Sequence, residues 1–235
     1  MQTGGTGVQA HSAFFGEEYV APEPVSWDDL RASGADFVEP GETAQWHAAQ
    51  TALQRHGLIV LVGAIGSGRG ILGLRLLRLA LPPNGSIYRL NPDWSKPKTK
   101  YLPELQREGV VLDLSFTSHE LPDEDFGRHL VDYGKQNLQR RQYTVVLSTP
   151  ELWDGSLAHA TQQVTFRFDG PDPTTLITRN LKLRKSEDRV GWLSESGVAA
   201  IISSRPRPSD ALRLSEIISA SLDKEDLAKR LGEFT

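Results

Sequence analysis

The stretch LIVLVGAIGSGRGILGLRLL, residues 58–77, decides the fold of this 235-residue chain. It opens with five consecutive apolar residues, 58–62, which predict a short strand buried on both faces of a sheet. Glycines then interrupt the run, and a leucine-rich helical pattern follows at once from Arg69. A strand that turns directly into a helix aims several backbone N–H groups at one point, and that geometry binds anions.

The glycine-rich turn matches part of the P-loop pattern G-x-x-x-x-G-K-[ST]. Its first and last required glycines have the correct spacing, but arginine stands in the lysine position and glycine in the Ser/Thr position. Arginine keeps the charge, yet its planar fork does not replace a compact ammonium between two phosphates. The missing hydroxyl removes a magnesium ligand. We therefore predict a nucleotide-binding loop without a metal ligand, made of Gly63, Ala64, Ile65, Gly66, Ser67, Gly68, Arg69 and Gly70. The alternative is a plain strand-to-helix turn that binds nothing.

A second candidate for phosphate chemistry is Asp113, at the end of the apolar segment GVVLDL, residues 109–114. A carboxylate in this position can hold the water shell of a magnesium ion. The next residues are Leu114 and Ser115, so no glutamate follows to polarise an attacking water. Asp113 is thus a degenerate catalytic candidate, and its alternative role is to cap the following turn.

The rest of the chain alternates apolar strands with helices, which predicts a parallel sheet covered by helices. Beyond residue 168 the strands stop, and four helical patterns follow. We predict an α/β fold: a three-layered, parallel-sheet P-loop NTPase core over residues 41–170 and a small C-terminal helical lid over 171–235. Residues 1–40 are expected to be a flexible tail and an irregular arm. The expected strands are 58–62, 86–90, 109–114, 143–148 and 164–168, and the lid helices are 173–184, 194–203, 209–222 and 224–231.

The order of these parts resembles the AAA+ class of P-loop ATPases, including the related STAND signalling branch, over roughly residues 41–222. AAA+ proteins place a polar sensor at the end of the strand that here ends in Ser148-Thr149, so Thr149 or Ser148 matches by position. Residues 166–174 resemble the proline-bearing turn into the lid. The helix that follows Pro208 resembles the lid helix with the second sensor arginine, and the resemblance implies that Arg213 faces the nucleotide phosphates.

The chain departs from that family at the lysine, the hydroxyl and the catalytic glutamate. No arginine finger can be placed, and Arg179 and Arg184 are candidates only by proximity. The resemblance thus supports the fold more than the ATPase activity. Because Arg69 begins a helix beside an open loop, we expect it to be exposed and Arg69→Ala to leave the fold intact.

The composition of the chain excludes several classes of binding site and catalytic chemistry. The net charge of -4 argues against broad electrostatic capture of DNA or RNA. The absence of cysteine excludes disulfides, thiolate metal sites and cysteine nucleophiles, and the six histidines show no metal spacing. No signal peptide or membrane-spanning run is present, so we expect a cytoplasmic protein without membrane contact.

The predicted function is a regulatory or scaffolding NTPase-like module, a pseudo-ATPase that binds ATP or ADP weakly and does not hold Mg²⁺ tightly. It would hold a protein partner or assemble with its own copies, in a bacterial signalling or defence system by analogy with the STAND branch. One alternative is an active ATPase in which Arg69 replaces lysine and Asp113 recruits magnesium. Another is a nucleic-acid-binding module that uses Lys96, Lys98 and Lys100.

Overall fold

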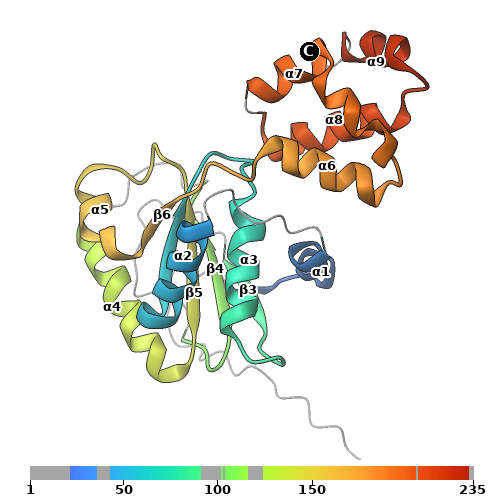
Figure 1. Ribbon diagram of the computed structural model, residues 1–235. Helices are drawn as coiled ribbons and strands as arrows, with labels where there is room; N and C mark the ends of the chain where they lie inside the picture. The colour runs from blue at the N-terminus through green and yellow to red at the C-terminus, as the bar shows by residue number, and fades with distance from the viewer. Residues whose placement is uncertain are drawn as a thin grey trace, which may run out of the picture.

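A computed structural model describes residues 22–35, 43–90, 102, 104–115, 124–204 and 206–232. The predicted tail, residues 1–16, and the lysine-bearing loop with Lys96, Lys98 and Lys100 lie outside the described residues. The described chain has two parts: a sheet with helices on both faces, and a helical unit next to one end of that sheet (Figure 1).

The sheet has the strand order β1-β3-β4-β5-β2-β6. All neighbouring strands are parallel except β1, which pairs antiparallel with β3. Strand β2, which lies between β5 and β6, is buried along its whole length, as its apolar run predicts. Since the parallel strands all end at one edge, the segments that follow β2, β4 and β5 meet there. The strands are β1 (Glu23–Pro24), β2 (Leu58–Val62), β3 (Ile87–Leu90), β4 (Gly109–Asp113), β5 (Tyr143–Ser148) and β6 (Thr165–Arg167).

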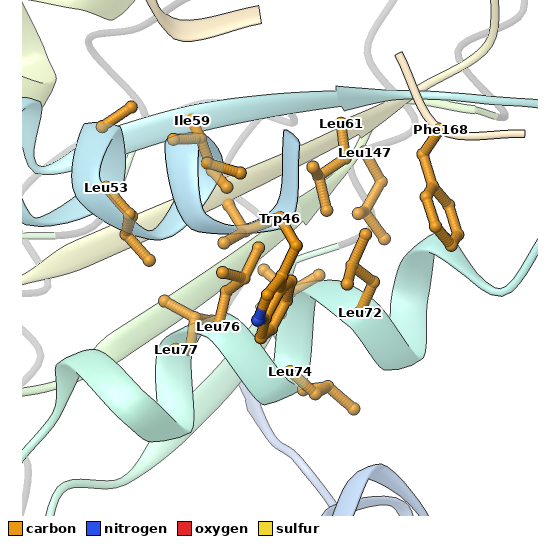
Figure 2. Close-up of a cluster of buried hydrophobic side chains, with 14 of the residues drawn as sticks. Trp46, Leu53, Ile59, Leu61, Leu72, Leu74, Leu76, Leu77, Leu147 and Phe168 are labelled. Carbon is orange, nitrogen blue, oxygen red and sulfur yellow. The ribbon is translucent and has the colours of Figure 1, made fainter. Parts of the chain in front are cut away.

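Helices cover both faces of the sheet, which confirms the three-layered prediction. On one face α2 (Thr43–His56) and α3 (Arg69–Ala80) share an apolar cluster with the strands. Trp46 points from α2 toward α3, and its neighbours in the cluster include Leu72 and Leu76 (Figure 2). On the other face α4 (Glu124–Arg140) and α5 (Gly155–Ala160) pack on a second cluster around Trp153.

Residues 22–35 form β1 and a helix, α1 (Trp27–Ala35), where the sequence predicts an irregular arm. Helix α1 packs against α3, and Val25 and Leu30 contact the core cluster. Trp27 does not pack as an aromatic anchor, because its side chain is 71% exposed. The arm is thus held by small aliphatic contacts and by pairing with the sheet edge.

The C-terminal unit is helical, as predicted, with its own apolar cluster that includes Ile177, Leu214 and Ile218. Its first helix begins at Pro173 and is capped by Asp172, whose carboxylate accepts a hydrogen bond from the Thr175 N–H at 2.7 Å. None of the described helices is long and apolar enough to cross a membrane. The unit consists of α6 (Pro173–Leu183), the 3-10 helix η3 (Glu187–Ser194), α7 (Ser196–Ser203), α8 (Pro208–Ala220) and α9 (Lys224–Leu231).

Candidate functional site

The glycine-rich loop that follows β2 is under tight steric constraint. The Gly63 N–H donates to the Ser148 carbonyl at 3.1 Å, which ties the loop to the end of β5. A Cβ at Gly63 would lie 2.3 Å from the Phe168 carbonyl oxygen, so only glycine fits there. Gly66 and Gly68 have φ values of 84° and 87°, in the left-handed region that glycine adopts without strain. These three glycines are therefore required by the path of the backbone.

The loop delivers the chain into the N-terminus of α3, and within it the Ser67 N–H donates to the Ala64 carbonyl at 3.1 Å. Gly68 is the N-cap residue, and no side chain caps the helix. The first N–H groups of a helix have no intrahelical acceptor, and the helix dipole makes this end positive. The Ser67 side chain is only 4% exposed, and its hydroxyl has no hydrogen-bond partner. Together these donors form a site suited to an anion such as a phosphate group.

Arg69 does not have the exposed position expected from the sequence. Its side chain is 6% exposed and donates to the Gly63 carbonyl and to the Ser115 hydroxyl. Burial lowers the pKa of the guanidinium, while the carboxylates of Asp113 and Glu151 act in the opposite direction. The expectation of an exposed helix end was wrong because the Arg69 side chain finds acceptors just beyond the ends of β2 and β4, at the Gly63 carbonyl and the Ser115 hydroxyl.

Asp113 lies at the predicted place, at the end of β4 and beside the loop. Its Oδ1 accepts hydrogen bonds from the backbone N–H of Ser115, at 3.0 Å, and from the Ser115 hydroxyl. The next residue, Leu114, is fully buried in the core. The position at which many P-loop ATPases have a glutamate is therefore filled by an apolar core side chain.

The end of β5 supplies Thr149 and an acid that the sequence analysis missed. Thr149 is 7% exposed, and its side chain hydrogen-bonds that of Glu151. The pKa of Glu151 is lowered, first by a backbone N–H and then by this contact and by the nearby Arg69 charge. The only sequence indication of Glu151 is an acid three residues after a strand that ends at the phosphate-facing edge. The structure thus brings Arg69, Asp113, Thr149 and Glu151 to the same edge of the sheet.

A pocket of about 300 Å³ opens beside Gly68, between α3, α6 and α8. Its wall is mainly apolar, with polar groups on the α6 and α8 side. Arg184 pairs with Glu216 there at 2.6 Å. An apolar pocket next to an anion site is a common arrangement for ligands with a ring system and a charged tail. The pocket is lined by Gly68, Ile71, Leu72, Phe168, Pro171, Leu176, Arg179, Asn180, Leu183, Arg184, Pro208, Leu212 and Glu216.

The lid approaches the loop through Arg207 and Pro208. A Cβ at Gly66 would lie 3.4 Å from Arg207 Cδ, and one at Gly170 would lie 3.5 Å from Pro208 Cγ. The sequence presents this segment as a mere connector, and its role is visible only in the tertiary structure. Arg213 is exposed on α8 and is not among the residues that line the pocket. Its assignment to the phosphates stays a prediction.

Comparison with known proteins identifies the fold. No protein-family model matches the chain, and no curated protein matches its sequence. The structure is similar to a chain of the E. coli MS115-1 HORMA:CdnC:Trip13 complex, with a TM-score of 0.54 and 12% identity, over 93% of this chain and 96% of that chain. It is also similar to domain III of the Thermotoga maritima replication initiation protein DnaA, with a TM-score of 0.51 and 14% identity, over 90% and 98% of the two chains. The chain therefore has the fold of an AAA+ P-loop NTPase domain.

Proposed function

We propose that this chain is a catalytically degenerate, AAA+/STAND-like NTPase module that binds ATP or ADP weakly, as a ligand that it does not hydrolyse. The observation that supports this most directly is the contrast within the site. The backbone cradle is intact, since Gly63, Gly66 and Gly68 have the conformations that the loop needs. The side chains for hydrolysis are absent, because Gly70 has no hydroxyl and Leu114 follows Asp113 in place of an acid.

The pocket gives the nucleotide an orientation. The phosphates would lie on the N-terminus of α3, near Gly68 and the unpartnered Ser67 hydroxyl. The base would enter the apolar pocket between α3 and the lid, where Ile71 and Leu212 are partly exposed on its wall. A bound nucleotide would then contact both parts of the chain, so its presence could set how firmly the lid is held.

The working role of the module is to hold a protein partner or to assemble with its own copies. One of its structural neighbours comes from a complex of HORMA, CdnC and Trip13 proteins, which is consistent with protein partnership in a bacterial setting. A bacterial signalling or defence system is the context that we propose.

The test combines binding and turnover on the purified chain. ADP and ATP binding is measured by calorimetry, with Mg²⁺ and with EDTA, and phosphate release is measured under the same conditions. We expect weak binding in both buffers and no phosphate release above background. The absence of any ADP or ATP binding would refute the ligand role, and robust Mg²⁺-dependent release would refute the pseudo-ATPase role.

A second candidate, an active ATPase, is favoured by one observation. Glu151 is hydrogen-bonded by Thr149 at the phosphate-facing edge, close to Arg69, and its carboxylate has a lowered pKa. A carboxylate there could orient water in place of the missing acid after Asp113. If the chain releases phosphate, Glu151→Gln should abolish the release while ADP binding persists.

A further inference from the structure

The AAA+ fold implies a Mg²⁺ ion beside the nucleotide phosphates. Mg²⁺ requires near-octahedral oxygen ligands at short distance. Gly70 offers no hydroxyl, and Asp113 Oδ1 already accepts two hydrogen bonds from Ser115. Among the described residues there is no group of three His, Cys, Asp or Glu side chains that could hold a metal ion. The residues present do not fit the ion.

A different cation occupies this part of the site. The guanidinium of Arg69 spans from the Gly63 carbonyl, at the start of the loop, to the Ser115 hydroxyl beyond the end of β4. The Ser115 hydroxyl in turn donates to Asp113 Oδ1. Arg69 and Asp113 are thus linked through one shared hydroxyl; Arg69 is buried, and Asp113 and Ser115 are half-buried.

Two nearby carboxylates favour a positive charge at the position of Arg69. Asp113 from β4 and Glu151 from the segment after β5 both act on the guanidinium through their negative charge. The Nε of Arg69 is buried without a hydrogen-bond partner. The missing hydrogen bond and the burial of the charge both cost free energy. By the P-loop pattern, a lysine at this position would instead extend toward phosphates.

We infer that the Arg69 guanidinium replaces the divalent cation: it joins the phosphate loop to the carboxylate-bearing end of β4, keeps metal ions out, and makes the site specific for metal-free phosphate ligands. The ligand-specificity part rests on the proposed function, since it requires the loop to bind a nucleotide. The exclusion of metal does not rest on the proposed function, because it concerns Arg69, Asp113 and Glu151 alone. The loop is held in shape before any ligand arrives.

The decisive experiment titrates Mn²⁺ alone, followed by its electron paramagnetic resonance signal, into the full chain. Wild type should show no specific Mn²⁺ binding. Arg69→Gln removes the positive charge beside Asp113 and Glu151, so it should bind Mn²⁺ at least about tenfold more tightly than wild type. Adding Asp113→Asn to this variant should abolish the gain. Arg78→Gln is the matched control: Arg78 lies on the same helix and bonds the Pro83 carbonyl at its far end, so this variant should behave as wild type.

Two results would overturn the inference. One is Mn²⁺ binding by wild type that Asp113→Asn removes. The other is a folded Arg69→Gln variant that binds no more Mn²⁺ than Arg78→Gln. If Arg69→Gln does not fold, calorimetry of ADP binding to the wild-type chain tests the inference instead. Equal affinity in Mg²⁺ and EDTA supports the inference, and an affinity at least about tenfold higher in Mg²⁺ overturns it. Failure of ADP to bind in either buffer refutes the proposed nucleotide ligand, while the wild-type Mn²⁺ titration still tests the exclusion of metal.

Discussion

Arg207, the last residue before α8, lies against Gly66 at the tip of the phosphate loop, where an added Cβ would be only 3.4 Å from Arg207 Cδ. This proximity brings the lid close to the loop. Arg207 is exposed, so its guanidinium is free to turn toward an anion on the loop. Arg213 lies further along α8 and outside the wall of the pocket.

The first prediction compares these two arginines. Arg207→Ala should weaken ADP binding by about 1 kcal/mol, or about fivefold in Kd, because an exposed charge-assisted contact to phosphate is lost. Arg213→Ala is the matched control, with the same change of charge in the same helical unit, and should stay close to wild type. Calorimetry on both variants measures the difference. A larger loss for Arg213→Ala would instead support the sequence-based assignment of Arg213 to the phosphates.

The second prediction concerns the stability contributed by Arg69. Arg69→Ala should lower the free energy of unfolding by about 1–3 kcal/mol, because the Gly63 carbonyl and the Ser115 hydroxyl lose a buried donor. For a domain of this size each kcal/mol corresponds to roughly 2–4 °C in Tm. Thermal unfolding followed by circular dichroism measures it. An unchanged Tm would mean that these contacts do not stabilise the fold, as an exposed Arg69 would imply.

The sequence is enough to predict the parts of this fold that depend on local patterns. Strand β5 has the predicted limits, Tyr143–Ser148, because a β-branched apolar run is bounded by a helix end and a proline. The lid helix α6 begins at Pro173 as predicted, because proline and Asp172 together mark a helix start. Each of these features is decided by residues within one turn or one strand.

The site depends on contacts between distant segments, and there the sequence analysis falls short. Arg69 is buried because it meets Ser115, which is 46 positions further along the chain. Glu151 belongs to the site because the ends of β4 and β5 lie side by side in the sheet. Arg207 reaches Gly66 only once the lid is folded back on the loop. No periodicity in the sequence reports any of these distances.

The third prediction tests how closely α4 packs on the sheet. An alanine Cβ at Gly134 would lie 2.7 Å from the His56 carbonyl oxygen and 2.7 Å from Leu58 Cβ. Gly134→Ala should therefore destabilise the fold by about 1–3 kcal/mol, although alanine favours helix more than glycine does. Gly191→Ala is the control, since nothing lies within 4 Å of its added Cβ. Urea unfolding measures both, and equal stability of the two variants would contradict the close approach.

The fourth prediction concerns the alkaline limit of stability. Burial raises the pKa of Tyr133 to about 12, against hydrogen bonds that lower it, and its hydroxyl accepts from Gln142 Nε2 at 2.7 Å. Because the folded state holds this proton more tightly, the stabilisation is complete below about pH 10 and is lost as the pH rises toward about 12. Urea unfolding at about pH 9 and about pH 11 should show a fall in stability that is smaller in Tyr133→Phe. Parallel curves for both proteins would contradict the assignment to Tyr133.

The last prediction separates nucleotide binding from hydrolysis with the double variant Arg69→Lys/Gly70→Thr. A Cβ at Gly70 would meet only Leu147 Cδ1, at 3.9 Å, so the threonine fits without strain. The variant regains the lysine and the magnesium hydroxyl of the P-loop pattern, so ADP should bind at least about tenfold more tightly in Mg²⁺ than in EDTA. Arg69→Lys/Gly70→Ala adds the Cβ without the hydroxyl and should show little of this Mg²⁺ effect. Phosphate release should stay at background in both variants, because Leu114 still stands where an acid would orient water and one such lost contact costs about a hundredfold in rate or more. Calorimetry measures the binding, and a phosphate-release assay measures the turnover. Fast turnover by the threonine variant would mean that Glu151 or another group supplies the missing acid. Fast Mg²⁺-dependent turnover by wild type, abolished by Asp113→Asn, would establish an active ATPase.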